Sequence, residues 1–204
     1  MFHYLKGDLC LGVPPPKGRI MMNEQGSALL IIFLEVFMQL FFYDVDADYV
    51  KYLKKEETSK RGFTKVPNIE YENEKKMICG VVLEINSFKY YVPVSSYKIK
   101  QNNNILIVLE DDDFNKVKGS LRFNYMFPVP DELVKVRDFS KENHQRAEFL
   151  RRQWVFCNSI LDEIYDMAKK TYDDVVNNKD TILKNNAFDF KILESALANY
   201  KKEQ

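Results

Sequence analysis

The 204-residue sequence has little of the chemistry on which many enzymes and metal-binding proteins depend. Two histidines, His3 and His144, leave very little for a Ser-His-Asp triad, a two-histidine nuclease or a histidine-ligated metal site. The three cysteines are odd in number and far apart, at Cys10, Cys79 and Cys157, and there is no CxxC pair. This cysteine usage fits a reducing cytosol and a protein without structural zinc.

Net charge is also absent, because 30 Lys and Arg residues balance 30 Asp and Glu residues. A neutral chain is not a general binder of nucleic acids, although one of its faces can still be basic. Hydrophobic residues make up 46% of the sequence and aromatic residues 14%, which excludes a disordered chain. The length suits one well-packed domain with an appended segment.

No apolar run is long enough to span a bilayer. The strongest candidate, ALLIIFLEVF at residues 28–37, is unbroken only over residues 28–34, and Glu35 interrupts it. No A-x-A cleavage site follows, and the preceding LGVPPPKGRI is a loop without a core pattern. We interpret residues 1–37 as an N-terminal extension, either a mis-assigned start before Met38 or an added helix. A membrane anchor or an export segment is the alternative.

The pattern becomes regular from residue 38. QLFFYDV predicts a strand, and Asp46 is suited to cap a helix over residues 47–57. The strand-like runs 77–85 and 88–94 meet at the turn dipeptide Asn86-Ser87. A second pair, 105–109 and 120–129, flanks the acidic run 110–113, which we interpret as a solvated hairpin tip, with a metal site as the alternative. Five short strands in one block predict a small antiparallel barrel or a strongly bent sheet.

The C-terminal third is predicted to be helical. Ser140 is a plausible N-cap, and apolar residues then recur at spacings of three and four from Ala147 to Val175, which predicts one long helix that can kink. A final helix within residues 187–202 is predicted to begin at Asp189. The expected fold class is therefore α+β, with long C-terminal helices packed on the strands.

The segment VPVSSYK ends the third predicted strand run, residues 88–94, with two hydroxyls and a cation, from Ser95, Ser96 and Lys98. RNA carries its own nucleophile, the 2′-hydroxyl, so an enzyme without metal can cleave it by aligning that oxygen and stabilising charge on the phosphorane. Hydroxyls can hold phosphate oxygens, and lysines can supply charge or move a proton. Taken alone, the segment is equally a polar surface turn.

Five quoted stretches together resemble the toxins of type III toxin–antitoxin systems, the ToxN/AbiQ family. They are DYVKYLKK, VPN, KKMICGVVLEINSFKYYVPVSSYK, LRFNYMFPV and FLRRQWVFCN, in this order from Met38 to about Lys202. The resemblance implies a domain over residues 38–204 with a Kid/MazF-like β-barrel. It also implies a metal-independent endoribonuclease that needs no cofactor and acts in defence against phage by abortive infection.

The same resemblance implies two kinds of RNA that the protein binds. One is an antitoxin RNA of the pseudoknot-repeat type, which the toxin also processes, and the other is a cellular or phage RNA substrate. We expect a closed protein–RNA hetero-oligomer in the cytoplasm, with no membrane association, and cleavage that leaves a 2′,3′-cyclic phosphate.

Site residues follow from the resemblance position by position. The family's hydroxyl pair and lysine fall on Ser95, Ser96 and Lys98. Ser95 occupies a position at which the family often has threonine. A catalytic tyrosine falls on Tyr49, which otherwise is a packing residue. The family's lysine falls on Lys76, with Lys75 adjacent as the alternative, and either is otherwise a solvated strand entry. A further tyrosine corresponds to Tyr71 with an offset of one residue.

RNA binding is predicted for the stretch KVRDFSKENHQRAEFLRR, which has six basic and three acidic residues. Its candidates are Lys135, Arg137, Arg146, Arg151 and Arg152. Such a patch attracts phosphates, although an ordinary solvated helix start has the same composition. Two alternatives to the enzyme stay open: a non-catalytic RNA-binding module, and a membrane-anchored interaction protein that depends on residues 28–37.

Overall fold

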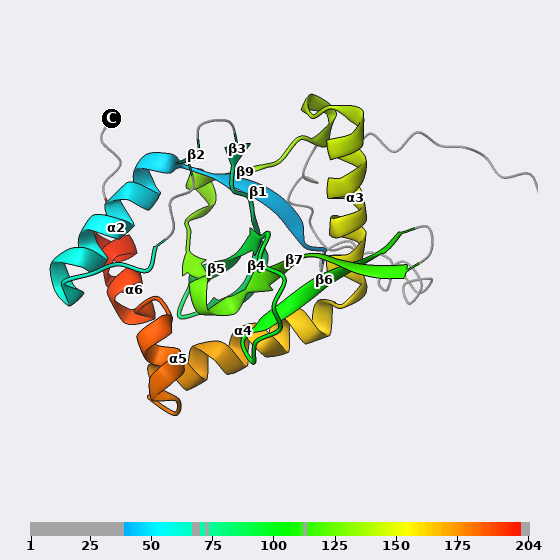
Figure 1. Ribbon diagram of the computed structural model, residues 1–204. Coiled ribbons are helices and arrows are strands. Elements are labelled where there is room, and N and C mark those ends of the chain that lie inside the picture. The colour runs from blue at the N-terminus through cyan, green and yellow to red at the C-terminus, as the bar shows by residue number, and fades with distance from the viewer. Residues whose placement is uncertain (1–38, 67–69, 72–73, 112–113, 201–204) are drawn as a thin grey trace, which may run out of the picture. The chain divides into compact units, whose positions relative to one another are not determined.

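The computed structural model describes residues 39–66, 70–71, 74–111 and 114–200; for residues 70–71, 74–75, 111 and 114–115 it describes the backbone alone (Figure 1). The predicted extension over residues 1–37 lies outside the described residues, as do Asp112 and Asp113 of the acidic run.

A mixed set of long and short antiparallel strands forms the main sheet. Its hydrogen-bonded order is β6-β7-β5-β4-β1-β9, and β8 pairs separately with β5. The strands are β1 (Phe41–Val45), β4 (Ile78–Ile85), β5 (Phe88–Ser95), β6 (Asn104–Asp111), β7 (Phe114–Arg122), β8 (Phe127–Pro128) and β9 (Val134–Val136). The predicted α+β class and the antiparallel pairing within both strand pairs are confirmed. The last strand, however, was predicted too far along the sequence: β7 ends at Arg122, and residues 123–125 form a short 3-10 turn. Among the described residues β6 and β9 are not paired with each other, so the sheet does not show the closed barrel that was predicted.

A two-residue turn and a close contact at a glycine fix β4 and β5 relative to each other. Asn86 and Ser87 have φ values of 50° and 66°, so they form the predicted two-residue turn in the left-handed region that short hairpins require. Farther along the pair, Gly80 lies opposite Tyr91, and a Cβ at residue 80 would come within 2.3 Å of the Tyr91 ring. The hairpin therefore brings the end of β5 into a fixed register with the start of β4.

Helix α2 (Ala47–Arg61) begins at the predicted cap. The Asp46 carboxylate accepts hydrogen bonds from the amides of Asp48 and Tyr49, each at 3.0 Å. The helix is one turn longer than predicted and ends at Gly62, whose φ is 79°. A small hairpin of β2 (Glu70–Tyr71) and β3 (Glu74–Lys75) follows.

The last turn of α2 is fixed by the buried side chain of Glu57. Its carboxylate accepts hydrogen bonds from Thr64 Oγ1 at 2.7 Å, Arg61 Nη1 at 2.7 Å, and the amides of Lys65 at 2.8 Å and Asp189 at 3.0 Å. Because Asp189 precedes α6 (Phe190–Asn199), one carboxylate joins the two helices, which lie side by side (Figure 1).

The long helical segment is divided in two. Helix α3 (His144–Ser159) and helix α4 (Leu161–Val176) meet at Ile160, whose φ of −129° interrupts the helix. The predicted N-cap was wrong: Asn143 accepts the hydrogen bond from the Arg146 amide, while Ser140 lies in a short 3-10 turn bonded to Asp138. A short helix α5 (Thr181–Asn186) precedes α6, which Asp189 caps as predicted by accepting a hydrogen bond from the Ile192 amide at 3.1 Å.

The core lies between the sheet and these helices and is rich in aromatic side chains. Tyr90 of β5 and Tyr172 of α4 donate hydrogen bonds to the same oxygen of Glu194 on α6, at 2.9 and 2.7 Å. The thiols of Cys79 and Cys157 are free and buried in this core. Within the part of the chain that the structure describes, no helix combines the length and apolarity needed to cross a membrane.

Candidate functional site

The chain turns immediately after β5, and hydrogen bonds hold the turn on both sides of Ser96. The Tyr97 amide donates to Ser95 Oγ at 3.2 Å, and Ser120 Oγ donates to the Tyr97 carbonyl at 2.7 Å. Ser120 lies on β7 directly opposite Ser95. The backbone of residues 95–97 is thus fixed against β7, with Ser96 between the two fixed residues.

Ser96 and Lys98 are both exposed. Neither side chain has a hydrogen-bond or ion-pair partner among the residues that the structure describes. The next lysine differs, because Lys100 Nζ donates to the Asn104 carbonyl at 2.9 Å. In the described part of the chain, a hydroxyl and an ammonium without partners therefore lie two residues apart, the hydroxyl within the held turn and the ammonium just after it.

A glycine permits the close approach of β7 to this turn. A Cβ at Gly119 would lie 2.5 Å from the Ser95 carbonyl oxygen, a distance that real Cβ atoms essentially never show. Gly119 precedes Ser120, so the close approach and the Ser120 hydrogen bond occur at the same point. The sheet packing, rather than the loop alone, determines where Ser96 lies.

Lys76, the lysine that the family resemblance predicts, lies near the end of β5. Val94 donates a backbone hydrogen bond to Met77 at 3.1 Å, which continues the β4–β5 register beyond Ile78 and Pro93. Lys76 directly precedes Met77 in the chain, so its backbone lies close to this end of β5, whereas the backbone of Lys75 pairs with Glu70 in the small hairpin. Lys76 is half-buried, and the side chain of Lys75 lies outside the description. The backbone of Tyr71 pairs with Glu74 in the small hairpin, and its side chain is likewise outside the description.

Tyr49 does not lie with these residues at the surface. It is fully buried, its hydroxyl donates to the Pro128 carbonyl at 2.7 Å, and its ring packs edge-on against Tyr200. Burial raises the pKa of Tyr49 far above its usual range. In the described conformation its hydroxyl is committed to the backbone and has no access to RNA.

The predicted basic patch is partly neutralised. Arg137 pairs with Asp44 at 2.8 Å and with Glu142 at 2.5 Å, so its charge joins β9 to neighbouring segments. Arg151 pairs with Glu148 at 3.5 Å on the exposed surface of α3, and Arg146 lies over the Phe149 ring. Arg152 is half-buried on the same helix.

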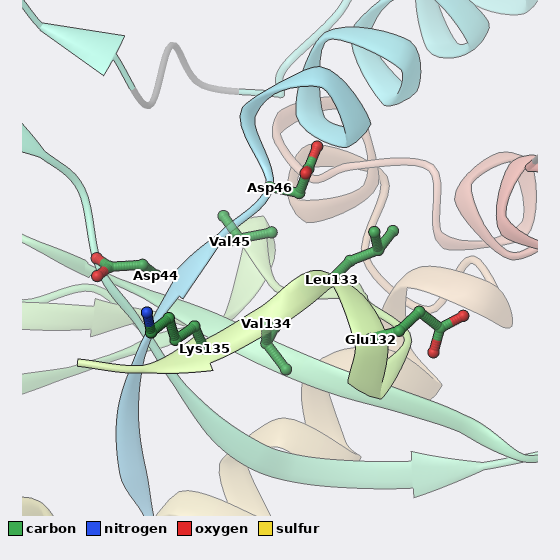
Figure 2. A pocket seen from close by; sticks show the side chains of 7 residues that line it. All are labelled: Asp44, Val45, Asp46, Glu132, Leu133, Val134 and Lys135. Carbon is green, nitrogen blue, oxygen red and sulfur yellow. The ribbon is translucent and has the colours of Figure 1, made fainter. Parts of the chain in front are cut away.

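Lys135 lines a shallow pocket between β1 and β9 (Figure 2). The same pocket is lined by the carboxylate residues Asp44, Asp46 and Glu132. Asp44 pairs with Arg137, but the three carboxylates still outnumber the two cations, Lys135 and Arg137, at this pocket, which disfavours a phosphate there.

A metal site has no support in the described part of the chain, where no three His, Cys, Asp or Glu side chains gather closely enough to hold an ion. Two of the four residues of the acidic run, Asp112 and Asp113, lie outside that part, so the alternative of a metal site there stays open.

Sequence reasoning missed Arg122, the last residue of β7. Its guanidinium carbon lies 4.6 Å from the centre of the Tyr97 ring and 4.3 Å from that of Tyr125. In the sequence, a basic residue next to aromatic residues was only a weak indication of a binding residue. The contact between Arg122 and Tyr97 depends on the turn after β5, which the sequence does not show.

Comparisons with known proteins agree on one family. A model described as the toxin ToxN of type III toxin–antitoxin systems matches residues 41–198. Endoribonuclease AbiQ of Lactococcus lactis subsp. lactis is 32% identical over 178 residues, which span 81% of this chain and 92% of AbiQ.

Two solved structures are similar in fold and cover 81% of this chain and 99% of their own. One concerns bacterial type III systems in which a non-coding RNA pseudoknot selectively inhibits the toxin; its TM-score is 0.69 at 27% identity. The other is AbiQ, a lactococcal anti-phage endoribonuclease of a type III system, with a TM-score of 0.66 at 26% identity.

Proposed function

This chain belongs to the ToxN family of type III toxin–antitoxin toxins, and we propose that it cleaves RNA without a metal ion at the turn that carries Ser96. As a member of this family it is an endoribonuclease of antiviral defence whose partner is an antitoxin RNA. The observation that carries the proposal is that Ser96 and Lys98 are exposed and have no partner among the described residues, at and just after a turn whose backbone is held by Ser95 and Ser120.

The proposed reaction uses the RNA 2′-hydroxyl. Its oxygen bonds to the adjacent phosphorus and loses its proton, while the bond from phosphorus to the 5′-oxygen breaks and that oxygen gains a proton. The products are a 2′,3′-cyclic phosphate and a 5′-hydroxyl. Ser96 Oγ donates to a non-bridging phosphate oxygen, and the ammonium groups of Lys98 and Lys76 stabilise the charge of the phosphorane.

The remaining candidates take supporting roles in this proposal. Ser95 fixes the turn through its bond to the Tyr97 amide. Tyr49 holds α2 against the Pro128 carbonyl and does not touch RNA in the described conformation. Lys75, Tyr71, Arg146, Arg151 and Arg152 remain candidates for phosphate or base contacts, whereas the ion pairs of Arg137 and the acidic neighbours of Lys135 weaken the case for these two.

Several wider features belong to the same proposal. We expect residues 38–204 to be the functional domain, with a strongly bent sheet related to the Kid/MazF fold. We also expect a cytoplasmic enzyme that processes its repeated antitoxin RNA and forms a closed assembly with it. Selective inhibition of the toxin by a non-coding RNA pseudoknot, described for one of the similar structures, supports this expectation.

Substitution of one hydroxyl tests the site. Ser96→Ala should keep its thermal stability and lose about 10²–10³ in cleavage rate, the usual effect of removing one donor to a transition-state oxygen. Each variant is induced in bacterial cells, and growth arrest and new 5′-hydroxyl ends in total RNA are measured. Ser195→Ala, an exposed serine of α6, is the matched control. A Ser96→Ala protein that arrests growth and cuts RNA as the wild type does would refute the proposal.

Chelation tests the chemistry separately. Cleavage of RNA by the purified protein should be unchanged in EDTA, because hydroxyl and ammonium groups supply the stabilisation. Loss of cleavage in EDTA and its recovery with Mg²⁺ or Mn²⁺ would instead support the acidic run at residues 110–113.

A further inference from the structure

Arg122 is a cation held by aromatic rings rather than by a carboxylate. The rings of Tyr97 and Tyr125 lie 4.6 and 4.3 Å from its guanidinium carbon. Arginine stays charged at every physiological pH, and an aromatic face offsets only part of the cost of removing that charge from water. Among the described residues, Arg122 has no ion pair and no hydrogen bond to its guanidinium.

The guanidinium nitrogens differ in their access to solvent. Among the described residues, none of the three guanidinium nitrogens has a hydrogen-bond partner; Nε is buried, whereas the two terminal nitrogens are accessible to solvent. Buried N–H groups nearly always have a partner, so a charged group left in this condition calls for an explanation. An anion that approaches the terminal nitrogens would supply the missing partner for the charge.

The contacts of Arg122 place it at the proposed cleavage site. Ser120 and Arg122 are two residues apart on β7, so their side chains leave the same face of the sheet, and Ser120 is opposite Ser95. Tyr97 is bonded through its carbonyl to Ser120 and through its amide to Ser95, and its ring contacts Arg122. One residue, Tyr97, therefore joins the held turn of Ser96 to the unpaired cation.

We propose that Arg122 is a phosphate-binding residue of the RNA site, oriented in advance by Tyr97 and Tyr125. The proposal rests on the proposed function, because it takes the phosphodiester of an RNA bound at Ser96 as the ligand. A planar guanidinium donates two parallel hydrogen bonds to one phosphate, which a lysine cannot do. The two rings restrict its rotation before RNA arrives, so less side-chain freedom is lost on binding.

The salt dependence of binding distinguishes a phosphate contact from a structural role. The probe is a fluorescent 2′-O-methyl RNA 20-mer of random sequence, which cannot be cleaved because its 2′-oxygens are blocked. For single strands the slope of log affinity against log salt changes by about 0.7 for each phosphate contact. The full-length Arg122→Gln protein should bind more weakly and show a slope smaller in magnitude by about 0.7.

Lys170→Gln is the matched control, because it removes one positive charge from α4, where Lys170 pairs with Asp174 at 2.9 Å. Its slope should equal that of the wild type. An Arg122→Gln protein with the wild-type slope overturns the proposal for Arg122 and leaves the Ser96 site intact. A wild-type protein that neither binds this probe nor cleaves cellular RNA overturns the proposed function itself.

Chemical protection of the wild-type protein supplies a test that no folding defect can affect. Phenylglyoxal modifies accessible arginines, and mass spectrometry locates the modified residues. The same RNA should protect Arg122 severalfold, while Arg61, which pairs with the buried carboxylate of Glu57, should react equally in both samples. An Arg122 that reacts to the same extent with and without RNA, or in neither sample, contradicts the proposal.

Discussion

At the scale of single residues, two lysines in one turn have different surroundings. Lys98 is exposed and has no partner in the described part of the chain, whereas Lys100 donates to the Asn104 carbonyl at 2.9 Å. Asn104 is fully buried and bonds in turn to the Ile99 carbonyl and the Gln101 amide. Lys100 therefore belongs to the internal bonding of the loop, and Lys98 is available to a ligand.

This difference predicts opposite effects of two similar substitutions. Lys98→Ala should unfold at the wild-type temperature and lose most RNA cleavage, because a charge near the phosphorane is removed. Lys100→Ala should keep cleavage and lose about 0.5–1.5 kcal/mol of unfolding free energy, the usual worth of one hydrogen bond. Urea unfolding and single-turnover cleavage, measured on both proteins, check the pair. Equal loss of cleavage in the two variants would show that general positive charge is sufficient.

The sequence could indicate Ser96 and Lys98 because both lie in one short segment that resembles the family. It could not indicate Arg122, whose contact with Tyr97 exists only once β5 and β7 are paired and the turn folds back. It also could not show that Tyr49 is committed to the Pro128 carbonyl, because helical spacing identifies the buried face and not the partner of a hydroxyl.

At the scale of secondary-structure elements, the carboxylate of Glu57 determines how α2 ends. Burial alone would raise the pKa of Glu57, but hydrogen bonds from Thr64, the amides of Asp189 and Lys65, and Arg61 outweigh it, and the pKa is lowered. A carboxyl group with a lowered pKa in the folded state adds stability above its unfolded pKa of about 4.3. That stability is lost as the pH falls through the folded pKa.

The pH dependence of unfolding should therefore change when this carboxylate is removed. Glu57→Gln should lower the unfolding free energy at pH 7 by about 1.5–3 kcal/mol, the range for hydrogen bonds to a charged group. It should then lose less further stability than the wild type between pH 5 and pH 3. Urea titrations at several pH values measure both effects, with Glu56→Gln as control, because the neighbouring Glu56 is only half-buried and pairs with Lys60 at 3.8 Å. Parallel curves for Glu57→Gln and the wild type would contradict this account.

Elements were predicted well where the signal is local. Asp46 and Asp189 cap the helices that follow them, and Asn86-Ser87 forms its turn, because each depends on bonds within a few residues. Ser140 failed as a cap because its hydroxyl and amide both bond to Asp138, which left the cap to Asn143. The break at Ile160 was not located, because the apolar spacing continues across it.

At the scale of the whole molecule, the family match over residues 41–198 and the strand pattern both begin just after Met38. The α+β class could be predicted from strand runs followed by helical runs, but the order of the strands could not. The order depends on the long-range pairing of β1 with β4 and β9, for which sequence spacing gives no indication.

We predict that a chain starting at Met38 folds and cleaves RNA as the full-length chain does. The expected result is equal thermal stability, equal growth arrest on induction and equal cleavage of cellular RNA. Expression of both chains side by side, with measurement of soluble yield and melting temperature, makes the comparison. Failure of the shorter chain to fold would assign a structural role to residues 1–37.

The two buried thiols have a practical consequence for following the enzyme in solution. A hydrogen bond with Cys157 and burial both raise the pKa of Cys79 well above its usual range, so the reactive thiolate is scarce. With Cys10 replaced by serine, a cysteine introduced at Ile99, whose side chain is 65% exposed in the loop after Ser96, should therefore accept a fluorophore selectively. Such a labelled toxin would report the arrival and departure of its antitoxin RNA in real time, without radioactivity and without waiting for cleavage.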